Sequence, residues 1–234
     1  MVIYSDPYIM PETPKICVIV IASPGKVYED FKRIWIENWE THGLHYGTLI
    51  FLYGRGLSDN PSKYDIHLDV ADSTVPGVLE KTLEMFRIIK DINYDFVFRT
   101  NLSSFLDINR YMPWLMSQKT SGLVAGCSPD RSHIGGCGMT LSRDVVEDIV
   151  NHRSDIDTGV VDDLALSSWL FPRYDIVWTK RIDFVYTNQV EVHNCDTTNT
   201  DFDDVYHFRF KNYDRTHDPD RMYEIFKNRT GGGL

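Results

Sequence analysis

An unbroken apolar run, I-C-V-I-V-I-A at residues 16–22, constrains the fold of this chain more than any other feature. Most of its residues are β-branched, and continuous runs of this kind are typical of strands buried on both faces of a parallel sheet. Similar runs recur downstream. We predict further strands at 48–53, 66–70, 95–99, 122–126, 138–141 and 175–179.

Amphipathic segments lie between these runs. The sequence D-S-T at 72–74 precedes a long apolar repeat of helical period, and Pro76 falls in its first turn, where a missing N–H costs little. The predicted helices are 27–38, 75–89, 107–117 with an interruption near Pro113, 143–152, 162–171 and 222–227. Alternating strands and helices predict an α/β fold in which helices flank a doubly wound, mostly parallel sheet.

The chain shows no internal repeat and no linker, so we predict a single domain over residues 15–234. Residues 1–14 contain three prolines and no periodicity, which predicts an extended arm.

Composition excludes several classes of protein. The chain has 24 Lys and Arg against 34 Asp and Glu, a formal charge of −10, and no basic run longer than two residues. We therefore expect it to bind neither nucleic acid nor anionic membranes. The four cysteines lie far apart without a C-x-x-C pair, which argues against structural zinc and a disulfide framework. No run is apolar enough for a transmembrane segment or signal peptide, so we expect a cytoplasmic protein.

Ligands of doubly wound sheets bind at the carboxyl ends of the strands, which directs attention to the loops that follow them. Ser23 follows the first strand. The predicted strand 95–99 leads into Arg99-Thr100-Asn101-Leu102-Ser103-Ser104, where Arg99, Asn101 and Ser103 bring polar groups to the same edge. The alternative interpretation is a strand-end turn stabilised by the Asn and Ser side chains.

Two further segments carry groups suited to chemistry. Asp162 and Asp163 begin a predicted helix, where a carboxylate is able to accept a proton or simply complements the helix dipole. The segment Y-H-F-R-F-K-N at 206–212 alternates like a strand, which places His207, Arg209 and Lys211 on one face. These cations would suit a diphosphate, and the alternative is a solvated edge strand.

Four segments together resemble the GT-A-type nucleotide-sugar glycosyltransferases of the β-1,3 kind. The stretch D-F-V-F-R-T-N-L-S-S-F-L-D resembles the K-T-D-D-D-v-F segment of that family, and H-L-D-V-A-D-S…L-E-K-T-L resembles its D-F-x-D-s-Y…L-t-x-K-T segment. G-G-C-G-M-T-L-S-R-D resembles G-x-G-y-v-l-S-r-d, and V-V-D-D-L resembles E-D-V. The resemblance spans roughly residues 15–212. The R-T-N-x-S-S-F segment is also similar to that of small stand-alone transferases of large DNA viruses, phages and bacteria, so the expected location extends to a host cytoplasm.

The resemblance implies a GT-A-like (Rossmann-like) domain that transfers a sugar from a nucleotide-diphosphate donor to a glycan or glycoconjugate acceptor, with inversion. It assigns Asp163 as general base with Asp162 in support. It assigns Ser23, Lys81, Arg99, Asn101, Arg209 and Lys211 to the donor. It assigns Ser103 and His207 to a divalent cation, Mn²⁺ or Mg²⁺, although Asn101 and Ser103 stand where the family has carboxylates.

The alternative is a non-catalytic domain that binds a nucleotide or carbohydrate and has a degenerate metal site. Loss of both carboxylates of the acidic motif favours this alternative, whereas the Asp162-Asp163 pair and the basic strand at 206–212 favour an enzyme. The absence of G-x-x-x-x-G-K disfavours a phosphate-loop kinase, and the absence of G-x-G-x-x-G after the first strand disfavours a dinucleotide-binding enzyme.

Overall fold

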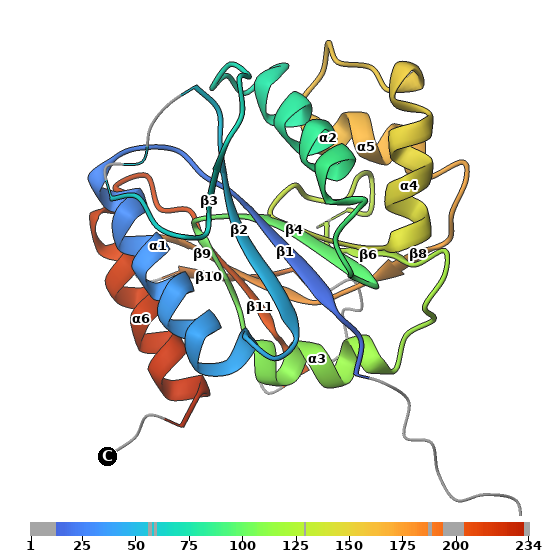
Figure 1. Ribbon diagram of the computed structural model, residues 1–234. Helices are drawn as coiled ribbons and strands as arrows, with labels where there is room; N and C mark the ends of the chain where they lie inside the picture. The colour runs from blue at the N-terminus through green and yellow to red at the C-terminus, as the bar shows by residue number, and fades with distance from the viewer. Residues whose placement is uncertain are drawn as a thin grey trace, which may run out of the picture.

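The structure is a computed structural model of the chain (Figure 1), and it describes residues 13–55, 58, 60–128, 130–186, 189–193 and 204–231. Most of the predicted arm, at 1–14, lies outside the described residues. The described chain forms an α/β fold with two sheets, and helices cover both faces of the larger one.

The larger sheet has seven strands in the order β3-β2-β1-β4-β7-β6-β8. Their bounds are β1 Ile16–Ile21, β2 Gly47–Tyr53, β3 Asp65–His67, β4 Phe96–Asn101, β6 Val124–Gly126, β7 Gly138–Ser142 and β8 Ile176–Trp178. All neighbouring strands are parallel except β7, which is antiparallel to both β4 and β6. The prediction of a mostly parallel sheet flanked by helices is therefore confirmed.

The helices divide between two apolar cores, one on each face of this sheet (Figure 1). One core lies beneath α1 (Lys26–Asn38), α3 (Ile108–Met116) and α6 (Asp218–Arg229). The other lies beneath α2 (Gly77–Ile89), α4 (Arg143–Asn151) and α5 (Asp162–Leu170). None of the helices within the described ranges is both long and apolar enough to cross a membrane.

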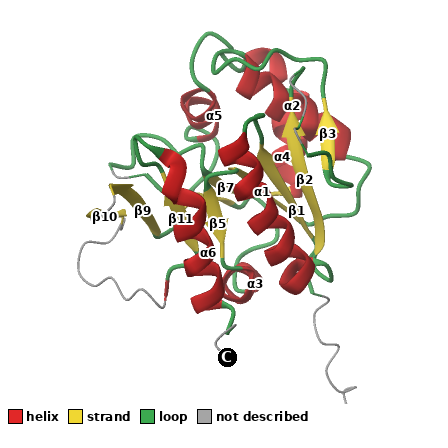
Figure 2. Cartoon of the chain, turned by 90° about the vertical axis from the view of Figure 1, so that its left-hand side faces the viewer, coloured by secondary structure: helices red, strands yellow, loops and turns green. Residues whose placement is uncertain are grey.

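A second, four-stranded sheet has the order β10-β9-β11-β5. Its strands are β5 Ser104–Leu106, β9 Arg181–Tyr186, β10 Gln189–His193 and β11 His207–Phe210. Helix α6 packs against this sheet through Phe226 on Phe105 (Figure 2). The strand prediction at 206–212 is confirmed by β11, whereas β5, β9 and β10 were not predicted.

The turn between β4 and β5 carries the chain from the larger sheet to the smaller one. Trp35 Nε1 donates to Leu102 O at 3.1 Å, and Asn38 Nδ2 donates to Leu106 O at 3.0 Å, so helix α1 holds both this turn and the end of β5. The position at which β4 delivers Asn101 is thereby set by buried hydrogen bonds.

The bounds of α2, α3 and α6 differ from the predictions, and the helix predicted at 222–227 spans Asp218–Arg229. Helix α2 begins at Gly77, after Pro76. Of the predicted cap residues, Ser73 accepts from Gly77 N through its Oγ at 3.1 Å, whereas Asp72 accepts from Lys81 and from Gly54 N. A side chain at Gly77 would lie 2.1 Å from Ala71 O, so the chain needs glycine at this close approach. Helix α3 continues through Pro113 to Met116, since a proline removes only one helical hydrogen bond there.

Candidate functional site

The carboxyl ends of β1 and β4 lie side by side, because these strands are parallel and pair Ile21 with Asn101. The start of α5, the turn 135–137 before β7, and strands β9 and β11 surround the same edge. Together they enclose a cavity of about 480 Å³. It is lined by Ile21, Val78, Arg99, Asn101, His133, Gly135, Gly136, Cys137, Asp162, Asp163, Arg181, Asp183, Arg209 and Lys211.

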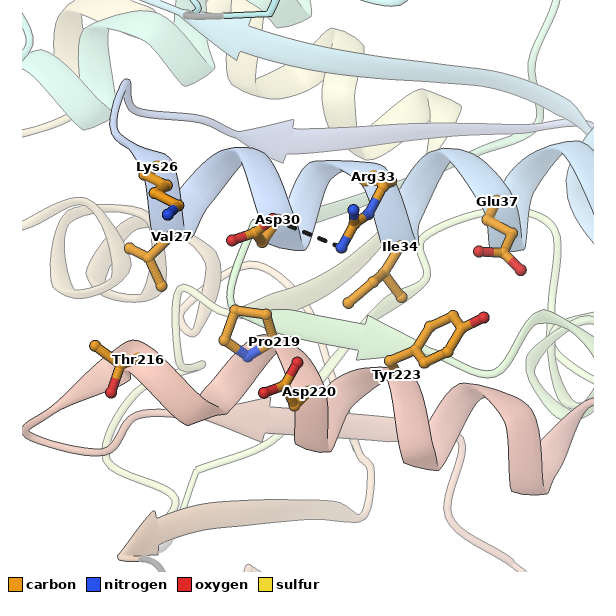
Figure 3. Close-up of a pocket in the computed structure, with 10 residues that line it drawn as sticks. All are labelled: Lys26, Val27, Asp30, Arg33, Ile34, Glu37, Thr216, Pro219, Asp220 and Tyr223. Atoms are coloured by element: carbon orange, nitrogen blue, oxygen red, sulfur yellow. Dashed lines mark ion pairs between the residues drawn. The ribbon is translucent and has the colours of Figure 1, made fainter.

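A larger groove of about 810 Å³ lies between α1 and α6 (Figure 3). Side chains of the two helices face each other across it. On α1, Asp30 and Arg33 form an ion pair of 3.6 Å, and on α6 the ring of Tyr223 is half-exposed. None of the residues that the sequence singled out lines this groove. The smaller cavity holds six of them and is the candidate functional site.

The cavity carries more positive than negative charge. Four cations line it, Arg99, Arg181, Arg209 and Lys211, against three carboxylates, Asp162, Asp163 and Asp183. The local excess contrasts with the formal charge of −10 for the whole chain. An excess of positive charge in a partly enclosed site favours an anionic ligand, because the local potential concentrates the opposite charge.

Asp183 is fully buried and is shared by two of the cations. Arg181 Nε and Nη2 donate to its Oδ1 and Oδ2 at 2.5 and 3.1 Å, and Lys211 Nζ lies 3.0 Å from Oδ2. One carboxylate is therefore shared by two cations, and one positive charge of this group is left in excess. Within the described part of the chain, Arg209 has no ion pair, and its buried Nε has no hydrogen-bond acceptor.

The two carboxylates at the start of α5 have different surroundings. Asp162 Oδ2 accepts a hydrogen bond from Arg99 Nη2. Asp163 Oδ2 accepts from Gly136 N at 3.3 Å, and its Oδ1 accepts from Leu164 N at 2.9 Å. The Asp163 side chain is 25 % exposed, against 13 % for Asp162. Asp162 is thus neutralised by a guanidinium, while Asp163 remains open to the cavity.

Asn101 reaches the cavity with its carboxamide oxygen already occupied. Ser103 Oγ donates to Asn101 Oδ1 at 3.3 Å, and Ser104 Oγ donates to the same oxygen at 3.1 Å. The amide nitrogen, a donor, is the group that Asn101 keeps for a ligand. Ser103 does not line the cavity; its hydroxyl receives Arg215 Nη1 at 3.5 Å.

His207 lies behind the cavity wall. A Cβ at Gly138 would be 2.1 Å from its Cε1, and its ring meets Phe98 edge-on at 5.6 Å between centroids. Burial, followed by the charge of Arg181, lowers the pKa of His207 to about 3, so the ring is neutral near pH 7. The described residues contain no cluster of three His, Cys, Asp or Glu arranged to hold a metal. The metal role of Ser103 and His207 stays a prediction.

Two of the predicted donor residues lie outside the cavity. Ser23 follows β1 and is partly exposed at the same edge of the sheet. Lys81 is buried in α2, where its Nζ lies 2.6 Å from Asp72 Oδ1. Val78, one turn earlier on α2, lines the cavity in its place.

Sequence reasoning missed Arg181, Asp183 and His133, which all line the cavity. The signal for the first two was present, since R-I-D-F-V-Y alternates polar and apolar residues as a strand does. His133 had no signal, because the residues around it, 130–137, form an irregular segment ahead of β7.

The fold and the site define an α/β protein with a positively charged cavity at the carboxyl edge of a mostly parallel sheet. No protein-family model matches the sequence. No curated protein shows significant similarity to it either.

Proposed function

We propose that this chain is a GT-A-like glycosyltransferase that uses a nucleotide-diphosphate sugar as donor and a glycan or glycoconjugate as acceptor. One observation carries the proposal. Asn101, Asp162, Asp163, Arg209 and Lys211, from three separate segments of the sequence, line one cavity with an excess of positive charge. These are residues that the resemblance assigned to donor binding and to proton transfer.

In the proposed reaction, the donor diphosphate faces Arg209 and Lys211. The acceptor oxygen attacks the anomeric carbon, and the bond from that carbon to the phosphate oxygen breaks. The nucleoside diphosphate leaves with the bonding electron pair, and Asp163 takes the proton of the acceptor hydroxyl. Guanidinium and ammonium groups stabilise the charge that develops on the leaving diphosphate.

The predicted metal ligands do not fit a divalent cation as their side chains stand. Ser103 lies outside the cavity, where its hydroxyl donates to Asn101 Oδ1 and accepts from Arg215, and the imidazole of His207 is enclosed against Gly138. Mg²⁺ and Mn²⁺ require accessible oxygen or nitrogen ligands in a defined geometry. A divalent cation that accompanies the donor would be held chiefly by the diphosphate oxygens.

Calorimetry with UDP, GDP, ADP and CDP, with and without Mn²⁺, tests donor binding. We expect at least one nucleotide to bind, and Arg209→Met to weaken that binding about 10- to 100-fold, since a hydrogen bond to a charged group contributes about 1.5–3 kcal/mol. Arg33→Met, an exposed arginine of α1, is the matched control and should leave binding unchanged. Absence of binding by the wild type at millimolar nucleotide would refute the proposal.

A non-catalytic nucleotide-binding domain is the second candidate, favoured by the neutral Asn101 and Ser103 at the motif positions. A turnover measurement distinguishes the glycosyltransferase from the non-catalytic domain. Turnover is measured as release of nucleoside diphosphate from UDP-glucose, UDP-N-acetylglucosamine and GDP-mannose, with water and monosaccharides as acceptors. Binding without any turnover across this panel would support the second candidate.

A further inference from the structure

The guanidinium of Arg99 is a buried charge in the central strand of the larger sheet. Its side chain is 3 % exposed, and an arginine does not lose its proton in a protein. A buried charge of this kind is tolerated only where partners compensate it. The identity of those partners therefore shows what Arg99 does.

Both terminal nitrogens of Arg99 are engaged, and they reach two different segments. Nη1 donates to Gly136 O in the turn before β7, and Nη2 donates to Asp162 Oδ2 at the first residue of α5. The planar guanidinium holds its donors in a fixed fork. One side chain of β4 thus sets the distance and orientation between the turn and the helix start.

The backbone of Gly136 passes this constraint to Asp163. Its carbonyl faces Arg99, and its N–H donates to Asp163 Oδ2 at 3.3 Å. A side chain at this position would force the Arg99 guanidinium to shift. A Cβ on Gly136 would lie 2.8 Å from Arg99 Nη1, 3.1 Å from Asp162 Oδ2 and 3.4 Å from Asp163 Cβ.

We propose that Arg99 is a positioning residue, which acts through Asp162 and Gly136 to orient the Asp163 carboxylate toward the acceptor, and does not contact the donor. This inference rests on the proposed function and changes the role of Arg99 within it. Asp162 is then the anchor of α5 on Arg99, and Asp163 is the base.

Kinetics and binding measured on the same variants test the inference. We expect Arg99→Met to lower kcat about 10²-fold, since a small misplacement of a catalytic group costs about that much. The affinity for the best-bound nucleotide of the panel UDP, GDP, ADP and CDP should stay within about two-fold of wild type. Arg99→Lys keeps the charge and one of the two contacts, and should recover part of kcat.

Two further variants guard against misfolding. The double variant Arg99→Met/Asp162→Asn removes the unpaired carboxylate, and should be no slower than Arg99→Met alone if both residues act as one unit. Gly136→Ala keeps every charge but places a methyl group against Arg99 and Asp162. It should lower kcat without weakening nucleotide binding. Gly159→Ala, in the exposed loop before α5, is the control for a glycine substitution and should behave as wild type.

The outcomes separate the inference from the proposed function. Weakened nucleotide binding in Arg99→Met comparable with that in Arg209→Met, at unchanged kcat, would make Arg99 a donor contact and overturn the inference alone. Unchanged kcat in folded Arg99→Met and Gly136→Ala would do the same. A wild type that neither binds nucleotide nor turns over a nucleotide sugar would overturn the proposed function, and the inference with it.

Discussion

The adjacent residues Asp162 and Asp163 differ in what remains available for chemistry. The guanidinium of Arg99 neutralises Asp162, whereas backbone N–H groups hold Asp163 with its carboxylate partly exposed to the cavity. We expect Asp163→Asn to reduce sugar transfer about 10²- to 10⁴-fold while nucleotide binding survives, since the amide keeps the shape but cannot accept a proton. Transfer rates at saturating donor check this.

Asp162→Asn should reduce transfer less, because asparagine still accepts a hydrogen bond from Arg99. Loss of transfer in Asp162→Asn with a near-normal rate in Asp163→Asn would exchange the two roles.

His207 makes the folding stability depend on pH. Its pKa falls from 6.5 to about 3 on folding, chiefly because burial penalises the charged ring. Above pH 6.5 the ring is neutral in both states, and between pH 6.5 and 3 only the unfolded chain binds the proton. Stability is therefore lost as the pH falls through this range, by about 1.4 kcal/mol per pH unit.

The free energy of unfolding in urea at about pH 7.5, 6.0 and 5.0 measures this slope. These values run from about one unit above the ordinary pKa to about 1.5 units below it. His207→Gln, which lacks the titrating ring, should lose less stability over the same interval. Equal slopes for the two proteins would show that His207 is not the responsible group.

At the scale of elements, two buried lysines tie helices to the loops around β2 and β3. Lys32 of α1 places its Nζ 2.7 Å from Asp65 Oδ2 and 2.8 Å from Ser58 Oγ. Lys81 of α2 pairs with Asp72, whose Oδ1 also accepts Gly54 N at 3.2 Å. These contacts hold the connections at the carboxyl edge of the sheet, next to the candidate site.

We expect Lys81→Met to lower the free energy of unfolding by about 1–3 kcal/mol, because it leaves Asp72 without its cation. Nucleotide affinity should change little, since the Lys81 ammonium does not line the cavity. Lys90→Met, an exposed lysine at the end of α2, is the matched control. Lost nucleotide binding at unchanged stability would instead support the donor role that the resemblance assigns to Lys81.

At the scale of the whole molecule, the two apolar cores share the strands of one sheet, so they should unfold together. Leu115 belongs to the core beneath α1, α3 and α6, and Leu83 to the core beneath α2, α4 and α5. We expect Leu115→Ala and Leu83→Ala each to destabilise the protein by about 2–5 kcal/mol. Both should shift one transition seen equally by far-UV circular dichroism and by tryptophan fluorescence. Two separate transitions would contradict the single-domain prediction.

The sequence alone determined most of the larger sheet and its helices. Local patterns predicted both β1 and α2. A strand buried on both faces leaves a continuous apolar run, as in β1, and a helix buried on one face leaves apolar residues at helical spacing, as in α2. The same holds for the alternation at 206–212, which predicted the strand β11; Arg209 of this strand and Lys211 just after it line the cavity, whereas His207 does not.

Only the tertiary structure decided which polar groups meet. The sequence predicted one site that contains Arg99, Lys81 and His207. In the structure, Arg99 pairs with Asp162 and Lys81 pairs with Asp72. His207 lies enclosed behind Gly138. Strand β5 was missed because its three residues are too few to show a period. Pairing of charges and direction of strands depend on residues far apart in the chain, and a local pattern carries no information about them.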